Sequence, residues 1–371
     1  MSDAPKPRDG VMDIAAYVGG ESNIPGVERI IKLSSNEGPF GPSVLASKAH
    51  AIEAANLHRY PDGGAVALRE AIGKRYNLEP ARIVCGAGSD ELISLLCSAY
   101  TSPGDEVLYS QHGFMMYPIS AKAAGATPVT APETNKTADV DALLGAVTDK
   151  TKIVFLANPN NPTGTYLPKT EIARLRDGLR DDILLVIDAA YAEYVKMDDY
   201  SAGIDLVDVG NNTVMTRTFS KIYGLGGVRL GWCYAPDNVV DVLNRVRGPF
   251  NVSSSAIAAG VAAIEDIAFE EMSRIHNDKW REWTAVELQK LGLDVTPSLG
   301  NFLLVCFGDD PDRNAEAADQ FLKARGIVIR RMNGYGFPNC LRITIGLEED
   351  MRAVINALAA FLGRNDTASE Q

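Results

Sequence analysis

One lysine of this chain stands in surroundings that suit covalent chemistry. Lys221 directly follows Ser220, with Thr218 three residues before it and Arg229 eight residues after it. A lysine amine can condense with a carbonyl compound, and hydroxyl and guanidinium groups beside it can hold a phosphate. The segment NNTVMTRTFSKIYGLGGVRLGW (211–232) therefore predicts a site for a phosphorylated carbonyl compound. A lone lysine in a polar turn is more often an exposed surface residue, so this prediction depends on the rest of the chain.

The segments around this lysine predict an α/β fold. Short apolar strands that alternate with helices favour a mostly parallel sheet covered by helices on both faces. Strand patterns lie at 106–110, 127–130, 152–157, 183–187 and 213–215, with helical patterns between them at 116–124, 140–147 and 169–179. A later helical region and a strand–helix–strand–strand–helix pattern predict a smaller α+β domain. We expect an N-terminal arm (1–35), a large domain (36–252) and a small C-terminal domain (253–371).

Polar and aromatic side chains follow the predicted strands where each one ends. Phe114 follows the strand at 106–110, the segment NPNNPTG with Asn161 follows 152–157, and Asp188 and Tyr191 follow 183–187. Lys221 comes after the strand at 213–215. Ligands bind beyond the carboxyl ends of strands in such sheets, so we expect these side chains to converge at one edge. Each of them taken alone would be an ordinary loop residue.

The segment RIVCGAGSDELISLL predicts a strand end, a tight glycine turn and a helix that begins at Ser89. Free backbone N–H groups at a helix start, here those of Ser89 and Asp90, bind phosphate well. A capped helix with no ligand is an equally good interpretation of this segment alone. A dinucleotide fingerprint would need a further glycine where Glu91 stands, which disfavours a nicotinamide-dependent dehydrogenase.

Together these residues supply the parts that a pyridoxal phosphate site needs. A carboxylate such as Asp188 can pair with a pyridinium nitrogen and keep the ring protonated as an electron sink. Phe114 can stack on the ring, while the amide of Asn161 and the phenol of Tyr191 can bind the ring oxygen. Lys221 can form the Schiff base, and the helix-start amides, hydroxyls and arginine can hold the phosphate.

Composition limits the other function classes. The chain has 371 residues, 46% hydrophobic and 23% charged, and a net charge of −12, which argues against a general nucleic-acid binder. The N-terminus lacks the apolar core of a signal peptide, and no apolar run reaches the ~18 residues of a membrane-spanning helix. The five cysteines are widely spaced, so we expect buried thiols in a cytoplasmic protein, with neither a disulfide nor a metal site.

The order of motifs gives a resemblance that covers nearly the whole chain. The chain resembles the fold-type I, pyridoxal-phosphate-dependent aminotransferases, and within them the histidinol-phosphate aminotransferases. The segments that carry the resemblance are, in order, KLSSNEGPFGPS, RYPDGG, GAGSDELI, NPNNPTG, DAAY, RTFSKIYGLGGVRLGW and NCLRITIG. The resemblance implies a reversible amino transfer in which glutamate leaves as 2-oxoglutarate and imidazole acetol phosphate leaves as histidinol phosphate.

The resemblance also implies a role for each site residue. Lys221 is the Schiff-base lysine and proton shuttle, and Asp188 pairs with the ring nitrogen. The implied ring contacts are Phe114, Asn161 and Tyr191, and the implied phosphate contacts are Ser89, Asp90, Thr218, Ser220, Arg229 and Tyr60. Tyr60 is expected to reach the phosphate from the partner subunit, which implies a homodimer. The implied substrate contacts are Tyr17, Asn36, Arg330 and Arg342, of which Arg342 grips a carboxylate.

Several alternatives remain open from the sequence. Gly38, Gly19 and Phe114 depart from the family's usual residues near the substrate, which bears on specificity more than on cofactor chemistry. An aromatic amino acid aminotransferase, or a pyridoxal phosphate decarboxylase of a phosphorylated amino acid, would use the same residues. A ligand-binding regulator that keeps the cofactor without turnover is disfavoured by the presence of Lys221, Asp188 and Arg342.

Overall fold

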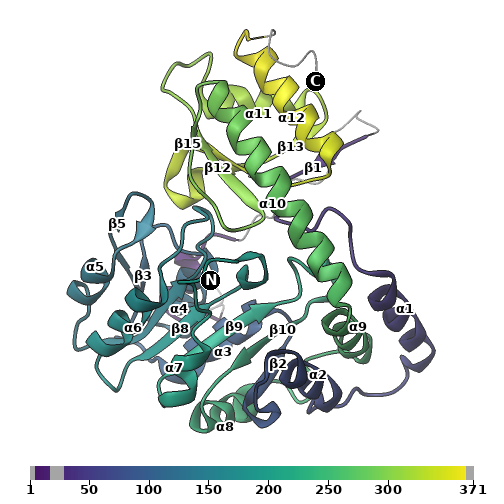
Figure 1. The fold of residues 1–371 in the computed structure, drawn as a ribbon. Helices are drawn as coiled ribbons and strands as arrows, with labels where there is room; N and C mark the ends of the chain where they lie inside the picture. The colour runs from purple at the N-terminus through teal and green to yellow at the C-terminus, as the bar shows by residue number, and fades with distance from the viewer. Residues whose placement is uncertain (1–4, 17–28, 365–371) are drawn as a thin grey trace.

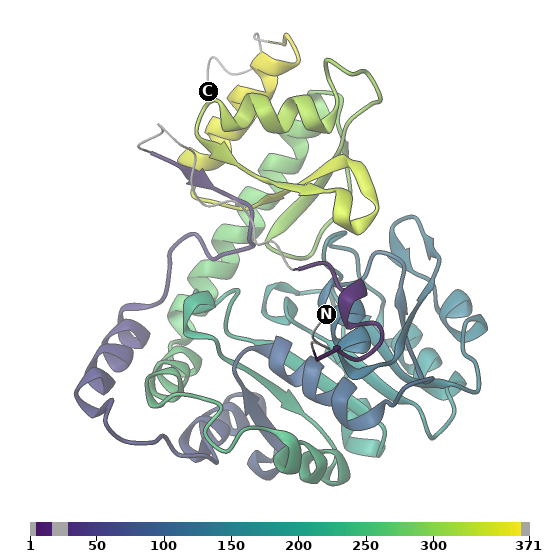
Figure 2. The same cartoon turned by 180° about the vertical axis from the view of Figure 1, so that it is seen from behind.

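The computed structural model describes residues 5–16 and 29–364. The described chain forms two lobes, with a seven-stranded sheet in the larger one and a four-stranded sheet in the smaller, C-terminal one (Figure 1). Helix α10 (Ile267–Lys290) runs from the larger lobe into the smaller one (Figure 1). In the opposite view, the segment 5–16 lies against the larger lobe (Figure 2), where the Arg8 guanidinium donates to the Ala124 carbonyl at 3.3 Å.

The large sheet has the strand order β2-β10-β9-β8-β7-β3-β4. Its strands are β2 (Ile83–Gly86), β3 (Glu106–Ser110), β4 (Thr127–Ala131), β7 (Thr151–Ala157), β8 (Leu184–Asp188), β9 (Thr213–Thr218) and β10 (Gly231–Tyr234). Only β10 runs antiparallel to its neighbours β2 and β9 within the described sheet, so the mostly parallel sheet expected from the sequence is confirmed. Strand β10 was not predicted, and β9 extends three residues beyond the predicted end, as far as Thr218.

Helices cover both faces of this sheet. Alternate residues of β8 point to opposite sides: Val186 packs with α3 and α4, whereas Leu185 packs with α6. The first face carries α3 (Ser89–Tyr100), α4 (Met116–Ala124) and α8 (Asp237–Val246). The second face carries α2 (Val66–Tyr76), α5 (Val140–Gly145), α6 (Lys169–Gly178), α7 (Ile204–Val209) and α9 (Ser254–Glu265). Burial of apolar side chains from both faces fixes the position of every strand end.

The smaller lobe is built on an antiparallel sheet of order β11-β12-β15-β14. Its strands are β11 (Asp294–Val295), β12 (Phe302–Cys306), β14 (Arg330–Met332) and β15 (Phe337–Thr344), and its helices besides α10 are α11 (Ala315–Lys323) and α12 (Glu348–Phe361). Strand β1 (Ile31–Lys32), far away in sequence, pairs in parallel with β13 (Ile327–Val328). The chain just before residue 36 is therefore attached to the smaller lobe.

The remaining elements are short. They are α1 (Val44–Ile52), the hairpin β5 (Glu133–Thr134) and β6 (Thr137–Ala138), and the 3-10 helices η1 (Val11–Asp13), η2 (Glu53–Asn56), η3 (Pro80–Arg82), η4 (Ala192–Tyr194), η5 (Gly226–Val228) and η6 (Asn333–Tyr335). The division into an arm, a large domain and a small domain remains our proposal. Helix α9 shares its buried residues with the core around α2, whereas Trp280 of α10 and Met351 of α12 share the core of the smaller lobe.

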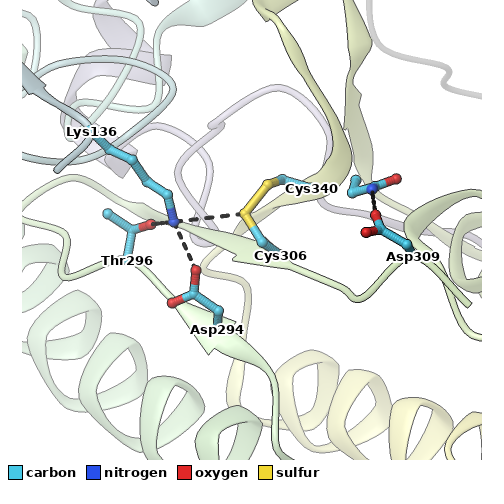
Figure 3. Close-up of a disulfide and its surroundings, with 7 residues drawn as sticks. Lys136, Asp294, Thr296, Cys306, Asp309 and Cys340 are labelled. Carbon is cyan, nitrogen blue, oxygen red and sulfur yellow. Dashed lines mark hydrogen bonds and ion pairs between the residues drawn. A yellow bond between two sulfur atoms is a disulfide. The ribbon is translucent and has the colours of Figure 1, made fainter. Parts of the chain in front are cut away.

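A disulfide joins Cys306 on β12 to Cys340 on β15 (Figure 3). The two residues are direct cross-strand partners, with Cα atoms 4.0 Å apart. The expectation that all cysteines are free thiols was therefore wrong for this pair. Their 34-residue separation gave no signal, because strand register and not local sequence brings them together. Cys85, Cys97 and Cys233 are buried free thiols, as expected.

Reduction of this disulfide is expected to lower the free energy of unfolding by about 3 to 4 kcal/mol, because a loop of this length constrains the unfolded chain. The measurement is urea unfolding with and without dithiothreitol. A Cys306→Ser/Cys340→Ser variant serves as the control and should show no response to the reductant. Alkylation of five thiols in the denatured, unreduced protein, instead of three, would contradict the disulfide.

Candidate active site

A cavity of about 270 Å³ lies at the carboxyl ends of the central strands, between the two lobes. Most of the residues predicted from the sequence line it. They are Asn36, Ser89, Asp90, Phe114, Asn161, Asp188, Tyr191, Thr218, Ser220, Lys221, Arg229, Arg330 and Arg342. Tyr60 lies outside the cavity, 82% exposed, with its ring stacked on Phe250 at 4.7 Å. Tyr17 lies outside the described residues.

One end of the cavity offers hydrogen-bond donors to an anion. Helix α3 begins at Ser89, and its first two residues, Ser89 and Asp90, line the cavity together with Thr218 and Ser220. The first N–H groups of a helix are free to bind an anion. The Arg229 guanidinium completes this end and pairs with the Asp90 carboxylate at 3.0 Å. Gly88 adopts a left-handed φ of +91°, and a Cβ there would lie 2.4 Å from an Arg229 nitrogen. The backbone conformation of Gly88, with φ +91° and ψ 161°, favours glycine where the helix begins, and any side chain there would displace the end of Arg229.

The cavity is also lined by a buried carboxylate. Asp188, at the end of β8, accepts a hydrogen bond from the Tyr117 hydroxyl at 2.9 Å and another from the Thr216 hydroxyl at 3.2 Å. Burial raises the pKa of Asp188 from its usual value of 3.8 to about 6, although the bonds from Tyr117 and Thr216 act in the opposite direction. A carboxylate with this environment favours a cationic partner on the side that faces the cavity.

Lys221 lines the same cavity, beside residues that could contact a flat ring. Its Nζ lies 5.8 Å from the centre of the Tyr191 ring. The Tyr191 hydroxyl accepts a hydrogen bond from the Asn36 side-chain amide at 2.8 Å. Phe114 reaches the cavity from the segment between β3 and α4 and meets Tyr117 edge to face, with ring centres 5.9 Å apart.

The smaller lobe contributes two arginines. Arg342 of β15 donates to the Asn161 side-chain oxygen at 2.6 Å and to the Ser34 carbonyl at 2.9 Å, although it is itself buried. Arg330 of β14 is its direct cross-strand partner. Two neighbouring guanidinium groups at this wall of the cavity suit a carboxylate or a phosphate.

Comparison with known proteins places the chain in a family. The model of the family "Aminotransferase class I and II" matches residues 28–358. The chain belongs to this family of aminotransferases.

Two curated relatives of this aminotransferase match over almost their whole length. A histidinol-phosphate aminotransferase of Paramagnetospirillum magneticum is 62% identical over 97% of this chain and 99% of its own. One of Rhodospirillum rubrum is 60% identical over 96% of this chain and 97% of its own. A crystal structure of the histidinol-phosphate aminotransferase of Sinorhizobium meliloti with pyridoxal-5'-phosphate has a TM-score of 0.88 at 26% identity, covering 97% of this chain and 99% of its own. The fold predicted from the motifs is thereby confirmed.

The lining of this aminotransferase's cavity fits a phosphorylated pyridine in its charged groups. The start of α3, the buried carboxylate of Asp188 and the amine of Lys221 all line the same cavity. A phosphate would meet complementary donors at the start of α3, and a protonated ring nitrogen would meet one at Asp188. Within the described residues, no three His, Cys, Asp or Glu side chains gather as they would around a metal ion. The helices of the described chain include none with the length and apolar character needed to cross a membrane.

Sequence reasoning missed three residues of the site. Tyr117 and Thr216 bind both oxygens of Asp188, and Tyr335 of η6 lines the cavity. Thr216 precedes Thr218 by two residues in β9, so strand periodicity could have placed both on one face. Tyr117 gave no signal, because it lies inside α4 among apolar residues and reads as a core aromatic.

The raised pKa of Asp188 predicts a pH-dependent stability of the cofactor-free protein. Because the folded state holds this proton more tightly than the unfolded state, the contribution of Asp188 is most favourable below pH 4. It falls by up to about 3 kcal/mol as pH rises through 6. Urea unfolding at pH 4 and 7 should therefore show Asp188→Asn gaining stability relative to wild type at the higher pH. Asp149→Asn, at an exposed aspartate, is the control, and its stability relative to wild type should not change between pH 4 and 7. The assignment would be contradicted if the stability of Asp188→Asn relative to wild type were equally independent of pH.

Proposed function

We propose that this aminotransferase binds pyridoxal 5'-phosphate and transfers an amino group from glutamate to imidazole acetol phosphate, giving 2-oxoglutarate and histidinol phosphate. The proposal fits the names of the relatives at 62% and 60% identity. The observation that carries it is that Lys221, the start of helix α3 and the buried Asp188 line one cavity. This reaction belongs to the biosynthesis of histidine.

We assign the proposed cofactor contacts to residues that line the cavity. When bound, the cofactor's protonated ring supplies an electron sink for the charge that develops at the substrate Cα. Asp188 would pair with the ring nitrogen, Phe114 would stack on the ring, and Asn161 and Tyr191 would bind the ring oxygen. The phosphate would be held by the backbone N–H groups of Ser89 and Asp90, the hydroxyls of Thr218 and Ser220, and Arg229.

Lys221 would perform two tasks in this proposal. Its amine carries the cofactor before the substrate binds. Once the substrate displaces it, the neutral amine moves a proton between the substrate Cα and the cofactor C4′. Its Nζ lies 5.8 Å from the centre of the Tyr191 ring, and it follows the proposed phosphate contacts Thr218 and Ser220 in the chain, which supports this role.

The two arginines of the smaller lobe would serve both substrates. Arg342 would bind the carboxylate of glutamate, and Arg330 would contribute to binding the phosphate of histidinol phosphate, to which we also assign Tyr17. The two residues are cross-strand partners and both line the cavity, so either guanidinium could bind an anion there.

We also propose a cytoplasmic homodimer. Tyr60 stands 82% exposed outside its own cavity and stacks on Phe250, which is 46% exposed. Leu57 and Ile52, nearby in sequence, are exposed as well. Exposed apolar residues on one segment are typical of a protein interface, and Tyr60 on that segment would reach the partner's phosphate.

The half-reaction of the purified enzyme tests this function. Histidinol phosphate and glutamate, added separately, should each convert the cofactor to its amino form, as seen by absorbance, with phenylalanine and tyrosine much slower. Lys221→Ala should lower the rate by at least about 10³-fold, because it removes both the covalent link and the proton carrier. Lys196→Ala, at a lysine whose side chain is 63% exposed, is the control. Faster reaction with the aromatic amino acids would assign the enzyme to those substrates, and release of CO₂ would indicate a decarboxylase.

Gly88 offers a separate test of the phosphate end. Gly88→Ala should weaken cofactor binding by at least about tenfold, since the new Cβ displaces Arg229 and one charge-assisted hydrogen bond is lost. Gly104→Ala is a matched control, because Gly104 has a similar φ of +99° with open space around it. Both variants place a Cβ on a glycine of positive φ, but only Gly88→Ala should lose affinity in a fluorescence titration. Equal losses would show that Arg229 does not bind the phosphate.

A further inference from the structure

Asn36 makes contacts to both lobes from a single buried position. It is 1% exposed and adopts a left-handed φ of +55°, which asparagine tolerates better than most residues. Its side-chain Nδ2 donates to the Tyr191 hydroxyl at 2.8 Å. On its other side, the Thr344 hydroxyl of β15 lies 3.1 Å from Asn36 Oδ1 and 3.0 Å from the Asn36 backbone nitrogen.

These contacts determine the direction of each hydrogen bond. The Thr344 hydroxyl accepts from the Asn36 backbone N–H, so its own proton goes to Asn36 Oδ1. The amide group is thereby oriented with Nδ2 toward Tyr191, whose oxygen must act as the acceptor of that bond. The single phenolic proton of Tyr191 is therefore directed to an acceptor other than Asn36.

We infer that Asn36 is a positioning residue, which together with Thr344 holds the Tyr191 hydroxyl as a hydrogen-bond donor toward the ring oxygen of the cofactor. The inference rests on the proposed function, in which Tyr191 binds that oxygen. It differs from the expectation that Asn36 contacts the substrate, because both polar ends of this side chain bind protein groups.

Strand β15 also orients Asn161, the second residue proposed to bind the ring oxygen of the cofactor. Arg342 lies two residues before Thr344 on β15 and donates to Asn161 Oδ1 at 2.6 Å, which leaves the Asn161 amide nitrogen to face the cofactor. Asn301, next to β12, donates to the Asn36 carbonyl at 3.0 Å. Both donors to the ring oxygen are thus oriented by side chains of the smaller lobe. A shift of β15 would act on them together.

A double-mutant cycle tests whether Asn36 acts through Tyr191. Aspartate also tolerates the left-handed backbone, but its carboxylate only accepts, so Asn36→Asp would draw the Tyr191 proton away from the cofactor. We expect the affinity of the cofactor-free protein for pyridoxal 5'-phosphate to fall about tenfold, the cost of one hydrogen bond to a charged group. In a Tyr191→Phe background the same change should alter the affinity by less than about twofold.

Thr344 provides a matched pair of variants that leaves Asn36 in place. Thr344→Val should weaken binding as Asn36→Asp does, whereas Thr344→Ser, which keeps the hydroxyl, should restore the wild-type affinity. This pair decides the matter if Asn36→Asp fails to fold. An equal loss of affinity with and without the Tyr191 hydroxyl would overturn the inference while the proposed function stands. Failure of the wild-type protein to bind the cofactor would overturn both.

Discussion

The burial of one carboxylate is the constraint on which the rest of this site depends. Asp188 ends a strand in the middle of the large sheet, where water cannot solvate its charge. Tyr117 and Thr216 each donate to one of its oxygens and offset part of that cost, yet its pKa remains raised to about 6. A cation in the cavity would offset the rest, which supports the proposed pairing of Asp188 with a protonated ring nitrogen.

The smaller lobe takes part in the site through alternate residues of one strand. Arg342 and Thr344 lie on the same face of β15, because side chains two apart in a strand point the same way. Each binds an asparagine that lies outside the smaller lobe's sheet, Asn161 in one case and Asn36 in the other. Hydrogen bonds thus connect the residues proposed to bind the substrate with those proposed to bind the cofactor ring.

Most of the main helices and strands of the large lobe could be predicted from the sequence. Features that depend on pairing between distant segments were mostly missed. Helix α4 and strand β3 were predicted to the residue, since apolar periodicity is a local property. Strand β10 was missed, because its four residues follow the loop of Arg229 and only pairing with β2 and β9 makes them a strand. The disulfide of Cys306 and the bond from Tyr117 to Asp188 have the same origin, as each joins residues that are far apart in the chain.

Close backbone packing explains the glycines in two segments near Lys221, the loop that follows it and the segment that contains Gly41. In the loop after Lys221, Gly224 has a φ of +65°, and a Cβ there would lie 2.1 Å from the carbonyl oxygen of Gly41. Any side chain at Gly224 would therefore push apart the Lys221 loop and the segment that begins at Asn36. That segment holds Tyr191 from one side while the loop presents Lys221 from the other. The glycines contribute no chemistry of their own, yet they allow the close approach that sets the distance between the amine of Lys221 and the phenol of Tyr191, the two groups proposed to act on the same cofactor.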